Sequence, residues 1–213
     1  MTGKIIEACS CPLFCGCYFS LLESLAMKRL SREDIAEEFH GEAKSYAPKT
    51  LIAGVRVQRL RRLVDDRGFF LEVFRRKADH PESADLAAFW DEIDPAQLNY
   101  SVVNSQDHIK GLHYHLQQED IWFCPPPSKI KIVLYDVRKT SPTFQRTQVI
   151  VAGDGNDIVV RIPEGVAHGY RPLTNPCALL YIVTKTFDLK DPDEFRISWD
   201  HPAVKNLWEI PNG

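Results

Sequence analysis

Two histidines separated by a single residue are the part of this sequence best suited to chemistry. His113 and His115 stand in KGLHYHLQQED, and Glu119 and Asp120 follow the second histidine by four and five positions. On a strand, residues two apart face the same side, so both imidazoles would point into one space. A neutral imidazole accepts a proton near neutral pH or binds a metal ion. We therefore expect a functional role for His113.

A third histidine follows a tight turn later in the chain. Pro163 and Gly165 build this turn in PEGVAH, ahead of His168. Three imidazoles with one carboxylate would suit Fe, Mn, Ni or Zn. The metal-ligand set would be His113, His115, His168 and either Asp120 or Glu119.

Strand patterns dominate the chain around these residues. Short segments with alternating or continuous apolar character predict strands at 55–60, 69–74, 99–103, 109–116, 121–124, 129–137, 147–151, 158–162 and 179–187. The DDRG sequence at 65–68 is a turn signal between the first two segments. Because no strand–helix–strand rhythm is present, the pattern favours an all-β sandwich or barrel.

Two short helices are predicted beside these strands. Ser31 followed by Asp34 resembles a capping box, and Ile35 and Phe39 lie one turn apart, so an amphipathic helix is expected from Ser31 to near Gly41. A second helix is expected over 82–93, before the Asp-Pro at 94–95. Its apolar face would consist of Leu86, Phe89, Trp90 and Ile93.

Composition excludes several classes of protein. Among 213 residues, 44% are hydrophobic and 26% are charged, which is globular rather than disordered composition. A net charge of −3 argues against a nucleic-acid partner. The longest uncharged apolar run, at 8–22, is too short for a membrane span, so no membrane association is expected.

The amino-terminal segment stands apart from the predicted barrel. Residues 1–26 hold four cysteines, and we expect this segment to be a disordered extension or to precede the true start at Met27. Residues 27–48 would form a helical lead-in, and 49–213 the barrel domain. Thiolates bind zinc, but two CxC pairs depart from the usual CxxC spacing. The cysteines are Cys9, Cys11, Cys15 and Cys17.

Five motifs between about residue 50 and 210 carry a resemblance to a known family. They are DRGFFLE at 66–72, GLHY at 111–114, DVRKTSPTF at 136–144, IPEGVAHGY at 162–170 and ISWDHP at 197–202. In this order they resemble the dTDP-4-dehydrorhamnose 3,5-epimerase family of the cupin superfamily. The resemblance implies a jelly-roll β-barrel that forms a cytoplasmic homodimer and needs no cofactor or metal.

The resemblance also implies an activity. The expected substrate is a dTDP-linked 4-keto-6-deoxyhexose used in rhamnose and polysaccharide biosynthesis, epimerised at C3, C5 or both. His113 would remove the proton alpha to the ketone, Tyr181 would be a proton donor, and Asp120 would orient His113. The residues implied to bind the nucleotide sugar are Arg67, Phe70, Glu72, Lys110, His115 and His168.

Three departures from the family pattern bear on this chemistry. The family's histidine-orienting aspartate finds no counterpart, so Asp120 is expected to orient His113 in its place. Phe187 occupies the position of the family's proton-donating tyrosine, and Asp120 stands near the position of its enolate-stabilising lysine. Two alternatives therefore stay open. One is a catalytically inactive binder of sugar nucleotides, and the other is a metal-binding cupin that uses the histidine and carboxylate set given above.

Overall fold

The computed structural model describes residues 29–41 and 51–210. It divides the chain into two compact units, 1–48 and 49–213. The four-cysteine segment and residues 27–28 and 42–48 of the lead-in lie outside the described residues.

The first unit contains two 3-10 turns where one amphipathic helix was predicted. They are η1 (Arg32–Asp34) and η2 (Glu37–Phe39). The capping contact forms, since the Ser31 backbone N–H donates to the Asp34 carboxylate at 2.7 Å. Ile35 and Phe39 are nevertheless exposed. The prediction of a continuous helix was wrong, because a short helix needs a packed apolar face to be stable.

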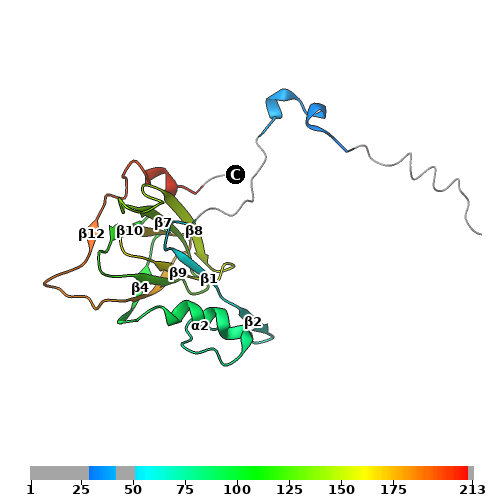
Figure 1. The fold of residues 1–213 in the computed structure, drawn as a ribbon. Coiled ribbons are helices and arrows are strands. Elements are labelled where there is room, and N and C mark those ends of the chain that lie inside the picture. Colours follow the sequence, from blue (N-terminus) through cyan, green and yellow to red (C-terminus); the bar gives the residue numbers. More distant parts are fainter. Residues whose placement is uncertain (1–28, 42–50, 211–213) are drawn as a thin grey trace, which may run out of the picture. The chain divides into compact units, whose positions relative to one another are not determined.

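Two five-stranded antiparallel sheets and one hairpin make up the second unit (Figure 1). The first sheet has the order β1-β9-β6-β11-β4, the second has the order β12-β5-β10-β7-β8, and β2 pairs with β3 alone. This architecture confirms the predicted all-β jelly-roll class. The strands are β1 (Arg56–Arg59), β2 (Arg62–Asp65), β3 (Gly68–Leu71), β4 (Gln97–Val103), β5 (Lys110–Tyr114), β6 (Asp120–Phe123), β7 (Lys129–Asp136), β8 (Thr147–Gly153), β9 (Ile158–Ile162), β10 (Val166–Pro172), β11 (Cys177–Val183) and β12 (Phe195–Arg196).

The main core is built by residues that alternate along the strands. On β7, Ile130, Ile132 and Leu134 join this core, whereas Val133 belongs to a second cluster. On β6, Trp122 joins the core and Ile121 belongs to a third cluster. This period of two is the one that strand geometry imposes. It also decides which polar side chains share the interior with the core.

Each of the two sheets also packs a helical element against the face that points away from the main core. The helix α2 (Ala84–Asp91) follows the 3-10 turn η3 (Pro81–Ser83) and packs Phe89 and Trp90 against Ile121 of the first sheet. In Figure 1, α2 lies beneath β1, β9 and β4. The turn η4 (Lys205–Trp208) places Trp208 against Val133 of the second sheet. The predicted helix at 82–93 is thus confirmed, with a shorter α-helical part.

Several strands were missed or misplaced by the sequence patterns. The DDRG turn joins β2 to β3 rather than β1 to β3, because a separate strand follows β1 at Arg62. Strands β10 and β12 were not predicted. The turn PEGVAH leads directly into β10, whose pairing with both β5 and β7 overrides the local turn signal.

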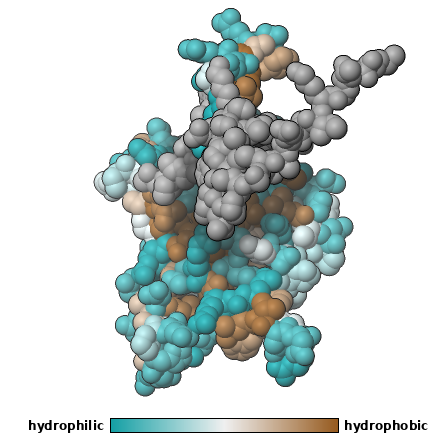
Figure 2. Space-filling model, turned by 90° about the vertical axis from the view of Figure 1, so that its right-hand side faces the viewer, coloured by the Kyte–Doolittle hydropathy of each residue, from teal (hydrophilic) through white to brown (hydrophobic). Residues whose placement is uncertain are grey.

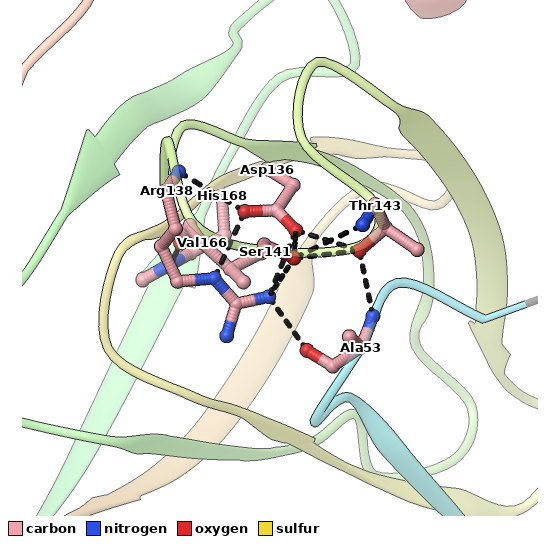
Figure 3. Close-up of polar contacts among 7 residues, drawn as sticks. All are labelled: Ala53, Asp136, Arg138, Ser141, Thr143, Val166 and His168. Carbon is pink, nitrogen blue, oxygen red and sulfur yellow. Dashed lines mark hydrogen bonds and ion pairs between the residues drawn. The ribbon is translucent and has the colours of Figure 1, made fainter.

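A buried carboxylate joins the loop after β7 to the segment before β1 (Figure 3). Asp136 accepts hydrogen bonds from the Arg138 guanidinium at 2.9 Å and from Thr143 Oγ1 at 2.6 Å. Thr143 Oγ1 also accepts a bond from the Ala53 backbone N–H, and Arg138 donates to the Ala53 carbonyl. Ser141 and Thr143, which carry part of the family motif, therefore serve the fold and do not line the cavity described below.

The surface of the protein is mixed in character. On the face shown in Figure 2, apolar residues occur in patches among hydrophilic ones. Within the ranges that the structure describes, no helix is long and apolar enough to cross a membrane.

Candidate active site

A cavity of about 400 Å³ is lined by strands of both sheets. His113 of β5 and Tyr170 of β10 line it from the second sheet, and Asp120 of β6 and Tyr181 of β11 from the first. Residues 185–188, 191, 193 and 194 contribute further lining side chains. This cavity thus contains most of the residues singled out by their chemistry.

Strand pairing brings the histidines together. His113 and His168 are direct cross-strand partners on β5 and β10, and their ring centroids lie 4.4 Å apart. His115 follows β5 and lies 5.2 Å from His113 by the same measure. Ligand atoms of these three residues and of Asp120 all lie within 4.8 Å of one another. The prediction that His113 and His115 share one space is confirmed, and the structure places His168 in the same space.

Two glycines allow β5 and β10 to approach closely beside the site. A Cβ at Gly111 would lie 2.6 Å from the Gly169 Cα, and one at Gly169 would lie 2.7 Å from the Lys110 carbonyl oxygen. Gly111 also has a φ of 124°, which residues with a side chain rarely adopt. Glycine is therefore required here for the pairing that places His113 next to His168.

The rings of His168 and His115 are held in the same manner. The Nδ1–H of His168 donates to the Val166 carbonyl at 2.9 Å, as Figure 3 shows. The Nδ1–H of His115 donates to the Asp193 carbonyl. Both rings therefore turn Nε2 toward Asp120, at 3.4 Å from His168 and 3.5 Å from His115.

Asp120 is the carboxylate of the site. Its oxygens accept hydrogen bonds from Gln118 Nε2 at 2.8 Å and from the Trp122 indole N–H at 3.0 Å. Burial opposes its ionisation, but the contacts with His168, His115 and Trp122 outweigh burial and hold its pKa below the usual value. Asp120 is therefore a carboxylate at neutral pH.

Glu119 is excluded from the site by a different partner. Its carboxylate pairs with Arg161 at 2.8 Å. Because neighbouring strand residues face opposite sides, only one member of the Glu119–Asp120 pair can point inward. The choice that the sequence left open is settled in favour of Asp120.

His113 is neutral and lines the cavity. Burial, followed by the nearby His168 and His115, lowers its pKa to about 3. Its ring is therefore in the form that accepts a proton. The described residues form no hydrogen bond to it, and Asp120 contacts His115 and His168 instead of orienting His113 as predicted.

Three further predicted positions also line the cavity. Lys110 donates to Ser101 Oγ at 3.1 Å. The pKa of Tyr181 is raised by burial and by the charges of Asp120 and Glu194, so its hydroxyl keeps its proton. Phe187 lines the cavity where the family pattern has a tyrosine.

The other three predicted substrate contacts lie elsewhere. Arg67 and Phe70 belong to the β2–β3 hairpin, and both side chains are exposed. Arg67 forms an ion pair with Asp65 of the same hairpin. Glu72 pairs with Arg75 at 2.8 Å. None of the three lines the cavity of their own chain.

Sequence reasoning missed two aromatic residues of the cavity. Tyr170 lies two positions after His168, and Trp122 two after Asp120, so strand alternation from each known site residue would have found them. The Tyr170 hydroxyl is buried and finds no hydrogen-bond partner in the part of the chain that the structure describes. Trp122 packs edge-on against the His168 ring, with centroids 5.2 Å apart.

Comparison with known proteins places these features in one family. Residues 49–212 match the family described as dTDP-4-dehydrorhamnose 3,5-epimerase. The spore coat polysaccharide biosynthesis protein SpsL of Bacillus subtilis is 37% identical over 159 residues, which cover 74% of this chain and 97% of that protein. The probable low-salt glycan biosynthesis epimerase Agl13 of Haloferax volcanii is 32% identical over 160 residues, covering 74% and 94%.

Solved structures agree with this assignment. The dTDP-6-deoxy-D-glucose-3,5-epimerase RmlC of Legionella pneumophila, in complex with dTDP-4-keto-L-rhamnose, has a TM-score of 0.62 and 25% identity, covering 76% of this chain and 82% of that chain. The family match includes the strands that carry His113, Asp120, His168 and Tyr181. The chain therefore belongs to the dTDP-4-dehydrorhamnose 3,5-epimerase family of isomerases.

Proposed function

We propose that the protein epimerises a dTDP-linked 4-keto-6-deoxyhexose at C3, C5 or both, in the biosynthesis of a deoxysugar-containing polysaccharide. The observation that carries this proposal is the neutral His113 in the cavity of a chain of this family. The names of its relatives, which include a spore coat polysaccharide protein and a glycan epimerase, support the biosynthetic role.

Epimerisation next to a ketone proceeds through an enolate. His113 would take the proton from the alpha carbon, and the electrons of that C–H bond would move onto the 4-keto oxygen. Polar donors of the cavity, Lys110 and Gln118 among them, are available to stabilise the resulting charge. Tyr181 keeps its proton at neutral pH and would return one to the carbon from the other face.

Deuterium exchange tests this proposal directly. The purified full chain is incubated with dTDP-4-keto-6-deoxyglucose in deuterated water, and the C3 and C5 protons are followed by proton NMR. We expect loss of at least one of these signals, because the carbon that His113 deprotonates takes deuterium from solvent. Binding of the sugar nucleotide without exchange would reject the epimerase and favour an inactive binder.

We also propose that the protein acts as a cytoplasmic homodimer, as the family resemblance implies. Arg67 and Phe70 can contact a substrate in the cavity only from a second copy, because they do not line the cavity of their own chain. Their hairpin also exposes apolar side chains, with Val64 72% and Phe70 64% exposed. A second chain would cover these side chains.

Mixing two impaired variants tests the shared site. Arg67→Ala should raise KM by at least ~10-fold, because a charged contact to the diphosphate is lost. If Arg67 acts across the interface, an equal mixture with His113→Asn forms heterodimers that each contain one intact site. After subunit exchange, activity should rise to about a quarter of the wild-type value, since half of randomly paired dimers are mixed. Additive activities, or a monomer by light scattering, would reject this arrangement.

A further inference from the structure

We propose that His115, Asp120 and His168 bind one divalent first-row transition-metal ion beside His113. His115 and Asp120 line the cavity of the proposed epimerase, and His168 lies beside them. The inference goes beyond that function, because the proposed proton transfer needs no metal. It also departs from the metal-free chemistry that the family resemblance implies.

The donor atoms converge as metal ligands do. Asp120 Oδ1 lies 3.5 Å from His115 Nε2, and Asp120 Oδ2 lies 3.4 Å from His168 Nε2. Ligands at about 2.0–2.2 Å from one ion in tetrahedral geometry are separated by roughly 3.3–3.6 Å. The observed separations therefore fit a common ion with little movement of the side chains.

Both imidazoles are fixed in the orientation that ligation requires. The Nδ1–H groups of His168 and His115 donate hydrogen bonds to backbone carbonyls. The Nε2 atom of each ring therefore faces Asp120. Such bonds are the usual outer support of a ligating histidine. The Nε2 of His168 is moreover buried, and among the described residues it contacts Asp120 Oδ2 at 3.4 Å but makes no hydrogen bond. A buried polar atom without a hydrogen bond costs free energy, and binding of a metal ion by this nitrogen would remove that cost.

The carboxylate carries outer support of its own. Asp120 is 2% exposed, and Trp122 and Gln118 each donate to one of its oxygens, so the carboxylate is held in place. The Gln118 amide also lies 3.3 Å from His115 Nε2 and occupies that lone pair. On metal binding it would keep only its bond to Asp120. Gln118 therefore supports the carboxylate ligand through its hydrogen bond to Asp120.

The ligand types select the class of ion. Two imidazoles and one carboxylate, without a thiolate, suit Fe²⁺, Mn²⁺, Ni²⁺, Co²⁺ or Zn²⁺. Ca²⁺ and Mg²⁺ prefer ligand sets made of oxygen atoms. The ligand atom of His113 lies within 4.8 Å of those of the other three residues, so His113 is close enough to contact a molecule bound at this ion.

The test uses the full chain with Cys9, Cys11, Cys15 and Cys17 replaced by serine, so that thiolates of that segment cannot contribute. This protein is freed of metal with a chelator and titrated with Co²⁺ and with Zn²⁺. Calorimetry gives the stoichiometry, and the visible absorption of Co²⁺ reports the ligand field. We expect one equivalent, without the near-ultraviolet sulfur-to-cobalt band.

Variants identify the ligands. Asp120→Asn and His168→Gln should each weaken binding by at least ~100-fold, because each removes a donor. His113→Asn and the exposed His108→Asn should bind as the parent does. Circular dichroism confirms that the variants are folded. Absence of binding at millimolar Co²⁺ and Zn²⁺, or binding unchanged in both ligand variants, would overturn the inference, as would loss of binding in His113→Asn.

These measurements are independent of catalysis. Metal binding without deuterium exchange would leave this inference standing and reject the epimerase. Deuterium exchange without metal binding would overturn this inference and leave the epimerase proposal standing. In the second case, His168 Nε2 and Asp120 would remain in direct contact at 3.4 Å.

Discussion

His113→Asn is expected to slow deuterium exchange at C3 and C5 by about 10³-fold, within the ~10²–10⁴ range of general-base catalysis. Asparagine has a similar size and polarity but no basic nitrogen near neutral pH. His113 is not a hydrogen-bonded part of the core among the described residues, so the fold should be kept. Exchange followed by NMR measures the first step alone and is therefore the appropriate readout.

The matched control for this experiment is His108→Asn. His108 is exposed and does not line the cavity, so its replacement should leave the exchange rate within about twofold of the wild type. The thermal midpoint of unfolding should be similar in both variants. A His113→Asn protein that is folded and exchanges at the wild-type rate would remove His113 as the base.

Asp136→Asn is expected to lower the free energy of unfolding by about 3–5 kcal/mol. Asp136 is fully buried and receives charge-assisted hydrogen bonds from Arg138 and bonds from two hydroxyls. The amide would remove the negative charge and place N–H donors against these donors. Urea unfolding at pH 7 measures the loss. Asp79→Asn breaks an exposed pair with Arg75 and should cost at most about 1 kcal/mol.

The cost of Asp136→Asn should depend on pH in a stated direction. Burial opposes ionisation of Asp136, but the bonds from Arg138, Ser141 and Thr143 outweigh it and hold its pKa below the usual value. A carboxyl group whose pKa is lowered by folding stabilises the native state above its unfolded pKa of about 3.9. This stabilisation is lost as the pH falls further. The wild-type advantage should therefore be constant near neutral pH and shrink below about pH 4. An advantage independent of pH down to pH 2 would show that the charge of Asp136 contributes nothing.

The barrel was largely predictable because strand periodicity is a local property. The alternation in 129–137 and 158–162 predicted β7 and β9, and Leu86, Phe89 and Trp90 predicted the buried face of α2. Local signals failed where long-range pairing decides the structure. Strand β10 follows a turn signal, but its hydrogen bonds go to β5 and β7, far away in the sequence. The prediction of a helix in the lead-in was wrong for the opposite reason. Its helical pattern is local, but the described residues of the lead-in offer no surface against which its apolar side chains could pack.

The sequence by itself determined the family, the fold class and the residue types of the site. His113 and His115 share a face because side chains alternate on a strand, and the five motifs stand in one linear order. Only the tertiary structure decided which residues meet. It chose Asp120 over Glu119, because Arg161 of β9 pairs with Glu119. It turned Asp120 toward His115 and His168 rather than His113, and it placed Arg67 and Phe70 outside their own cavity. These outcomes depend on register and packing between distant strands, which a linear pattern does not encode.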